Sequence, residues 1–216
     1  MKKIAVILSG AGVFDGAEIH EAVLALHAIE KAGASWHCFA PNMNQHHVIN
    51  HLTGEEMPET RNVLVEAARI ARGNIEDIAT LNATDYDGLL LPGGFGAAKN
   101  LSDFAFAGPN CTIHPDVKRV CQQFAEEEKP AGYLCISPAL IPLIYGEGAK
   151  GTIGNDPETA KAFNQMGGEH IECPVDDFVF DQERCLLSTP AYMLAGSISE
   201  AAAGIDKLVQ QLVKLA

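Results

Sequence analysis

The segment GYLCIS, residues 132–137, places a cysteine where an apolar strand ends and a Ser-Pro pair begins a helix. A residue at such a junction sits on a sharp turn beside the first amide groups of the next helix. The N-terminus of a helix favours negative charge, so it lowers the pKa of a nearby thiol. Most buried cysteines are nevertheless inert packing residues. The segment therefore predicts either a reactive Cys135 or a core thiol, and the rest of the chain has to decide between them.

Apolar runs of strand length alternate with stretches of helical periodicity on both sides of this segment. The predicted strands cover residues 3–8, 35–39, 88–91 and 130–134, and the predicted helices cover 18–31, 63–72, 116–128, a turn or more from 137, and 199–215. This alternation is typical of βαβ units, and continuous apolar strands indicate a parallel sheet buried on both faces. We predict an α/β fold with a mostly parallel sheet, a small antiparallel hairpin within 170–188, and a single domain over 1–216.

Composition limits the class of partner. The chain has 216 residues, 47% of them hydrophobic, and a formal charge of -13. So acidic a chain is unsuited to nucleic acid or anionic membranes, which require basic patches, and a small neutral or metabolite-sized partner is favoured. The first residues lack a signal-peptide pattern and no run is long enough to span a bilayer, so we expect a cytoplasmic protein. Its six cysteines form no CxxC pair, which indicates reduced thiols.

Loops at the carboxyl ends of parallel strands carry the chemistry of such sheets. After the first strand, SGAGVFDGAEIHEAV (9–23) turns through glycines into a helix that holds Glu18 and Glu21 on one face. The glycines could indicate a dinucleotide site. That site would require an acid at the end of the second strand, where the sequence has Ala40 and Pro41, so we reject this interpretation.

A second such loop is LLLPGGFGAAKNL, residues 89–101, where an apolar strand breaks at Pro92 into Gly93 and Gly94. Adjacent glycines leave backbone N–H groups open to an anion or to a developing oxyanion, although they also occur in plain turns. In the third loop the N–H of Ile136 is available in the same way.

Three segments together resemble a known superfamily. AEIHE at 17–21, DYDGLLLPGG at 85–94 and GYLC at 132–135, in this order and spacing, are similar to the superfamily of the Parkinson's-disease-associated deglycase and PfpI protease. Within it the chain resembles, over nearly its whole length, the family known as enhancing lycopene biosynthesis proteins or sigma cross-reacting proteins. The resemblance implies a flavodoxin-like three-layer sandwich of the class I glutamine amidotransferase-like type, a homodimer, and cofactor-independent glyoxalase activity.

The same resemblance implies roles for individual residues. Cys135 matches the nucleophile, Glu21 matches the glutamate that hydrogen-bonds its sulfur, and Gly94 and Ile136 match the oxyanion-hole amides. The superfamily often has a histidine about twenty residues after the cysteine, where this chain has Gly154 and Asn155. Other candidates for the pocket or for proton relay are Glu18, Gly93, His114, Asn155, Asp156 and Tyr192. His46, His47 and His51 lack an acid or cysteine that would complete a metal set, so we predict no metal and no cofactor.

These candidate residues suggest two functions of different class. In the first, the Cys135 thiolate adds to glyoxal or methylglyoxal, and the hemithioacetal is converted to glycolate or lactate by a glyoxalase III-like lyase activity. In the second, the same thiol is a redox sensor or regulatory group without efficient turnover, connected with isoprenoid supply through the family name. An amidotransferase subunit is a weaker alternative, because the sequence shows no Cys-His-Glu set.

Overall fold

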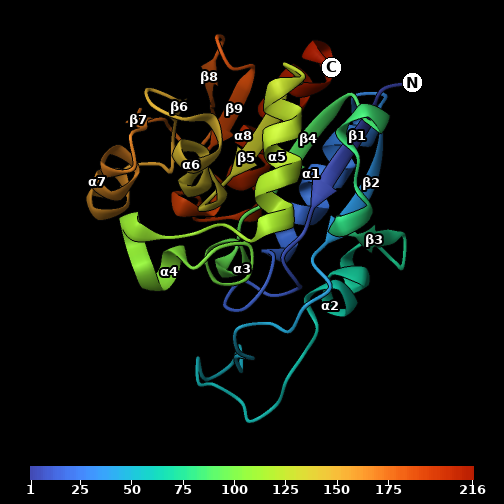
Figure 1. Cartoon of the computed structure of the whole chain (residues 1–216), viewed down its shortest axis with the longest axis vertical. Coiled ribbons are helices and arrows are strands. Elements are labelled where there is room, and N and C mark those ends of the chain that lie inside the picture. The colour runs from blue at the N-terminus through green and yellow to red at the C-terminus, as the bar shows by residue number, and fades with distance from the viewer.

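The computed structural model describes residues 1–216 and contains a seven-stranded sheet in the order β3-β2-β1-β4-β5-β9-β8 (Figure 1). Every neighbouring pair is parallel except β8 and β9. A second, two-stranded parallel sheet joins β6 and β7. The strands are β1 (Lys3–Ile7), β2 (Ser35–Ala40), β3 (Ile75–Asp77), β4 (Gly88–Leu91), β5 (Ala131–Leu134), β6 (Lys150–Gly151), β7 (Glu169–His170), β8 (Val179–Asp181) and β9 (Leu186–Thr189).

Helices cover both faces of the large sheet (Figure 1). They are α1 (Ile19–Lys31), α2 (Val63–Ile70), α3 (Phe95–Lys99), α4 (Phe104–Ala107), α5 (Pro115–Glu126), α6 (Ile141–Tyr145), α7 (Pro157–Gln165) and α8 (Ile198–Leu215). Alternate residues of β1 enter different cores. Ile4 and Val6 pack with α1, α2 and α8, whereas Ala5 and Ile7 pack with α5 and α6. This division into two cores is the reason why the strands are apolar throughout, and it confirms the predicted three-layer α/β sandwich.

The predicted hairpin is also confirmed, with a difference in its connection. β8 pairs antiparallel with β9, and β9 pairs parallel with β5, so both strands of the hairpin belong to the seven-stranded sheet and β8 forms its edge. Six elements were not predicted from the sequence: β3, β6, β7, α3, α4 and α7. No helix of the structure combines the length and apolar character needed to cross a membrane.

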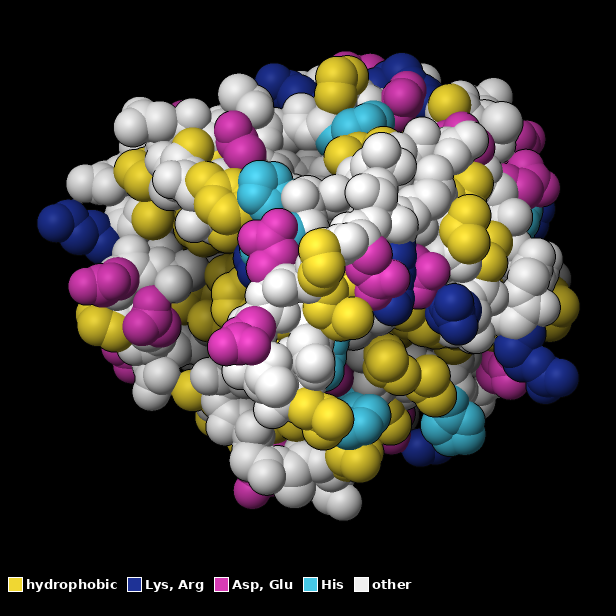
Figure 2. Space-filling model, turned by 90° about the horizontal axis from the view of Figure 1, so that it is seen from below, with side chains coloured by type: hydrophobic (Ala, Val, Ile, Leu, Met, Phe, Trp, Pro, Cys, Tyr) yellow, Lys and Arg dark blue, Asp and Glu magenta, His cyan; other side chains and the backbone are white.

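The strand order brings the reactive loops together. β1, β4, β5 and β9 are consecutive in the sheet, and Leu134 at the end of β5 is in register with Thr189 at the end of β9. The loops after these four strands therefore meet at one edge, which lies at the bottom of Figure 1 and faces the viewer in Figure 2. Hydrophobic, acidic and histidine side chains lie next to one another on that face.

Candidate functional site

Cys135 lies on a strained turn directly after β5. Its N–H still donates to the carbonyl of Thr189 at 3.0 Å, so strand pairing continues up to the cysteine. Its φ of 61° is in the left-handed region, which costs a residue with a side chain about 1 kcal/mol or more. The Ser137 hydroxyl holds the turn, because it accepts from the N–H of Leu134 and donates to the carbonyl of Leu91, both at 2.9 Å. The turn aims the thiol into the edge of the sheet and leaves Cys135 7% exposed.

The Glu21 carboxyl lies beside this thiol although it comes from the first turn of α1. Glu21 is 0% exposed. Its two carboxyl oxygens accept from the N–H of Gly93 at 2.9 Å and from the N–H of Tyr192 at 3.1 Å. The thiol of Cys135 is a third hydrogen-bonding partner. Burial raises the pKa of Glu21 to about 7, and the Glu18 carboxylate contributes in the same direction, while the three hydrogen bonds oppose the rise. Glu21 can therefore hold or release a proton near neutral pH.

The two glycines after β4 are required by the close approach of three segments. A Cβ on Gly93 would lie 2.4 Å from the Cβ of Cys135, and one on Gly94 would lie 2.3 Å from the nitrogen of Glu18. Gly94 also has a φ of 90°, which side chains rarely allow. The N–H groups of Gly94 and Ile136 both donate to the Cys135 sulfur. The structure thus brings together the thiol, the carboxyl and the two amides that the sequence predicted.

The prediction of a lowered thiol pKa is wrong for the resting protein. Burial and the neighbouring Glu21 carboxylate raise the pKa of Cys135 well above its usual range, and the amides of Gly94 and Ile136 offset only part of this rise. The helix after the cysteine begins as a four-residue 3-10 helix, η4 (Ser137–Leu140), so few aligned peptide dipoles support a thiolate. Cys135 is accordingly a neutral thiol that needs an adjacent proton acceptor before it can attack.

A cavity of about 380 Å³ opens onto the thiol. It is mainly apolar and is lined by Val13, Gly94, Phe95, Cys135, Ile136, Thr159, Tyr192 and Met193. A larger cavity of about 530 Å³ has no part in this site, because Cys185 and the acids around it lie at the opposite end of β9. The cavity at Cys135 therefore offers a small uncharged molecule access to the sulfur.

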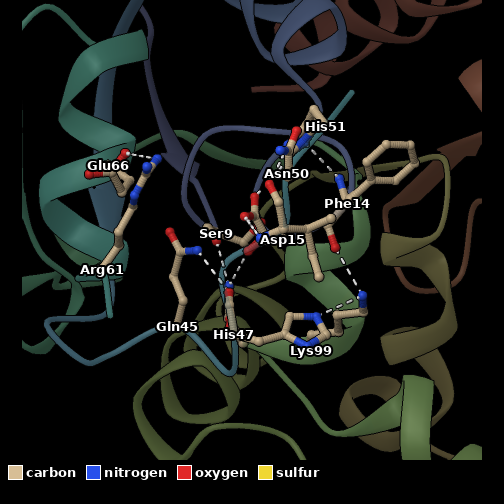
Figure 3. A network of polar contacts seen from close by, with 12 residues as sticks. Ser9, Phe14, Asp15, Gln45, His47, Asn50, His51, Arg61, Glu66 and Lys99 are labelled. Atoms are coloured by element: carbon tan, nitrogen blue, oxygen red, sulfur yellow. Dashed lines mark hydrogen bonds and ion pairs between the residues drawn. The ribbon is translucent and has the colours of Figure 1, made fainter. Parts of the chain in front are cut away.

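A polar network links the loop after β1 to the 41–62 excursion and to α3 (Figure 3). The buried Asp15 carboxylate accepts from the N–H of Ile49 at 2.8 Å, which ties the loop after β1 to the long 41–62 excursion. Lys99 donates to the carbonyl of Phe14 at 2.9 Å and to His47 at 3.0 Å. His51 accepts from the N–H of Phe14 at 3.2 Å, so both His47 and His51 are hydrogen-bonding loop residues.

Three further residues that were predicted as pocket or relay candidates are not part of the lining of this cavity. Asp156 is an exposed N-cap of α7 whose carboxylate accepts from the N–H and hydroxyl of Thr159 at 2.8 and 2.6 Å. Asn155 lines a separate cavity beside Cys173. His114 precedes α5 and its N–H is bound to the carbonyl of Leu101, so its backbone belongs to a neighbouring loop and its ring does not line the cavity. The Asp156 carboxylate is bound to Thr159, which lines the cavity, so Asp156 lies beside the cavity, whereas Asn155 and His114 are not part of its lining.

Two other candidates do belong to the site. Glu18 is the N-cap of α1, where its carboxylate accepts from the N–H of Glu21 at 2.7 Å and so sets the position of the buried acid. Tyr192 lines the cavity and donates its N–H to Glu21. The sequence analysis missed His20, whose Nδ1 lies 2.9 Å from the Tyr192 hydroxyl. Its place between the two glutamates in AEIHE was the one available signal.

Solved structures establish the class. The fold matches the crystal structure of an isoprenoid biosynthesis protein with amidotransferase-like domain from Ehrlichia chaffeensis with a TM-score of 0.93, at 38% identity over 100% of this chain and 99% of that one. Glyoxalase III from Candida albicans has the same fold with a TM-score of 0.61 and 17% identity, covering 95% and 94% of the two chains. The protein therefore has the fold of this amidotransferase-like domain.

Curated relatives identify the family within that class. The mitochondrial ES1 protein homolog of Rattus norvegicus is 40% identical over 223 residues, covering 99% of this chain and 84% of its own length. The mitochondrial glutamine amidotransferase-like class 1 domain-containing protein 3 of Homo sapiens is also 40% identical, with coverage of 99% and 83%. The chain belongs to this ES1 family. No family model matches the sequence.

Proposed function

We propose that the protein is a cofactor-independent glyoxalase that converts glyoxal to glycolate, and methylglyoxal to lactate, through Cys135. The observation that carries this proposal is the contact of the Cys135 thiol with a buried carboxyl whose pKa is raised to about 7. An acid with a pKa near neutrality both accepts and returns protons efficiently at physiological pH. The superfamily includes a protein named glyoxalase III, which supports the choice of reaction.

The first step forms a carbon–sulfur bond. As the sulfur attacks one aldehyde carbon, the thiol proton passes to the Glu21 carboxylate and the carbonyl electron pair moves to oxygen. That oxygen is stabilised by the amides of Gly94 and Ile136, which are already directed to the sulfur, and it takes the proton to give a hemithioacetal. The neutral resting thiol is compatible with this step because its acceptor is in contact with it.

The second half of the reaction moves a hydrogen within the hemithioacetal and then breaks its carbon–sulfur bond. The hydrogen on the sulfur-bearing carbon passes as a proton to the Glu21 carboxylate and from there to the neighbouring carbonyl oxygen, which gives an enediol. Glu21 then moves the hydroxyl proton of the sulfur-bearing carbon to the neighbouring carbon, which gives a thioester of the hydroxy acid. Water then adds to the thioester carbon, the carbon–sulfur bond breaks with its electron pair on sulfur, and the sulfur recovers a proton. The products are glycolate and the free enzyme.

Replacement of the thiol tests this proposal. We expect Cys135→Ala to reduce glycolate formation from glyoxal to background, as measured by chromatography of the acid product. Cys185→Ser is the matched control, since Cys185 is partly exposed and lies at the other end of the sheet. Undiminished glycolate formation by Cys135→Ala contradicts the proposal.

A redox or regulatory role is the second candidate, and it is supported by the same cavity, which gives a small oxidant access to Cys135. The isoprenoid link in the name of the Ehrlichia chaffeensis protein makes a role in regulating isoprenoid supply part of this candidate. Intact-mass measurement after mild peroxide distinguishes the two. Selective oxygen addition at Cys135 in a protein that forms no glycolate favours the sensor.

A further inference from the structure

The proposed reaction requires proton exchange that Glu21 alone does not provide. Its carboxyl is completely buried, and its hydrogen-bonding partners are backbone N–H groups and the thiol itself. Water must lose a proton when it attacks the thioester, and no histidine lines the cavity to accept it. A side chain that lines the cavity and also reaches solvent would be in position to carry this proton away.

Tyr192 is placed on such a route. It lines the cavity, and its own N–H holds one oxygen of Glu21. Its hydroxyl lies 2.9 Å from Nδ1 of His20, and the two rings are 5.8 Å apart between centroids. The His20 side chain is 51% exposed, so the Tyr192–His20 pair connects the cavity wall with bulk water.

Glu18 completes the arrangement. Its Oε1 lies 4.0 Å from Nδ1 of His20, and its Oε2 accepts the N–H of Glu21 at 2.7 Å. Glu18, His20 and Glu21 come from one helical turn, whereas Tyr192 comes from the loop after β9.

We propose that Tyr192 and His20 form a proton relay between the cavity and solvent that replaces the histidine absent from this chain. This inference rests on the glyoxalase reaction proposed above and assigns its hydrolytic step. As the water oxygen bonds to the thioester carbon, one water proton passes to the Tyr192 oxygen, and the phenolic proton passes to Nδ1 of His20. The carbon–sulfur electron pair stays with sulfur. The Glu21 carboxylate takes up a proton from water in the cavity and passes it to that sulfur, so Glu21 ends as the carboxylate that the first step requires, and His20 releases its proton to solvent.

Replacement of each relay member tests the inference. We expect His20→Gln and Tyr192→Phe each to lower kcat for glyoxal by about 100-fold, which is the lower end of the range for acid–base catalysis. Alkylation of Cys135 by iodoacetamide should keep its wild-type rate, because the thiol and Glu21 are untouched. His27→Gln is the control, since His27 is exposed on the same helix.

Chemical rescue separates a relay from a packing role. Imidazole added to His20→Ala should restore at least a tenth of the lost kcat, because the vacated position is open to solvent, and it should leave Tyr192→Phe unchanged. Wild-type kcat in His20→Gln, or a loss that imidazole does not restore, overturns the relay and leaves the glyoxalase proposal intact. Absence of glycolate formation by the wild type overturns the glyoxalase proposal, and the relay falls with it.

Discussion

Glu21 is the residue on which the chemistry of the site depends, because its environment makes an ordinary acid into a group that titrates near pH 7. In an unfolded chain its pKa is near 4.5, and in the folded protein burial raises it to about 7. The folded state therefore binds this proton more tightly than the unfolded state does. By linkage, this group makes the protein less stable as pH rises from about 4.5 to 7, with little further change above that range.

This shift gives a stability test at the residue scale. Between pH 5 and pH 7.5 the unfolding free energy of the wild type should fall relative to Glu21→Gln by about 3 kcal/mol at most, since one pKa unit corresponds to about 1.4 kcal/mol. Urea unfolding at several pH values measures the difference between the two proteins. Glu30→Gln on the same helix is the control. If the difference in unfolding free energy between the wild type and Glu21→Gln stays constant across this pH range, the assigned pKa is wrong.

Glu21→Gln should also be less stable at every pH. Both carboxyl oxygens accept from backbone N–H groups, and an amide can satisfy only one of them, so its NH₂ would face a donor. A buried donor left without an acceptor costs about 1–3 kcal/mol. This loss of unfolding free energy is the same at every pH. It can therefore be separated from the pH-dependent difference, which changes as Glu21 titrates.

At the scale of elements, the turn after β4 determines whether the site can form. Gly94 has a φ of 90° and touches the backbone of Glu18, while Gly73 has a φ of 81° and open space within 4 Å of where a Cβ would lie. Both substitutions to Ala introduce the strain of the left-handed region, but only Gly94→Ala also forces α1 away from β4. We expect Gly73→Ala to cost about 1 kcal/mol and Gly94→Ala to cost several, or to prevent folding.

Thermal and urea unfolding of the two variants measure these costs. Where Gly94→Ala folds, its kcat should also fall, because Glu21 and the sulfur are held by the same contact. Equal stability losses in the two variants would show that the close packing of α1 on this turn is unimportant.

The elements themselves were predictable to different degrees. The long apolar strands and the periodic helices were predicted because each has enough residues to show its pattern, as in β1 and α8. β6 and β7 have two residues each, and β3 has three, so no periodicity could indicate them. α7 was missed because Phe163 is its one fully buried residue, which leaves the helix without a clear apolar face in the sequence.

The candidate site was predictable where the residues lie next to a strand end. Cys135, Gly93 and Gly94 follow β5 and β4 directly, so sheet topology alone placed them together. The place of His20 in the site could be inferred only from the structure. Its partner Tyr192 is 172 positions away in the chain and is brought close by the parallel pairing of β9 with β5. Asp156 was predicted from its position in the chain, and the structure shows its carboxylate as a helix N-cap bound to Thr159, which lines the cavity.

At the scale of the whole molecule, the charge and the cavity bear on which dicarbonyl compounds the proposed glyoxalase would accept. The chain carries a formal charge of -13, and the cavity wall is mainly apolar with Glu18 and Glu21 behind it. An apolar cavity of about 150 Å³ is enough to hold benzene, so the cavity of about 380 Å³ has room for an aromatic group beside the reacting aldehyde. We therefore expect phenylglyoxal to have a higher kcat/KM than glyoxal, because its ring buries apolar surface that glyoxal lacks.

A phosphorylated 2-oxoaldehyde should be a poor substrate for the same reasons. Its kcat/KM should rise when ionic strength increases from about 10 to about 150 mM, because salt screens repulsion by the acidic surface, whereas that of phenylglyoxal should stay constant. Met193→Trp, which narrows the cavity, should reduce turnover of phenylglyoxal far more than that of glyoxal. Preference for the phosphorylated compound at low salt would mean that a cationic site, absent from the cavity lining, governs recognition, and the assignment of neutral dicarbonyls would then be wrong.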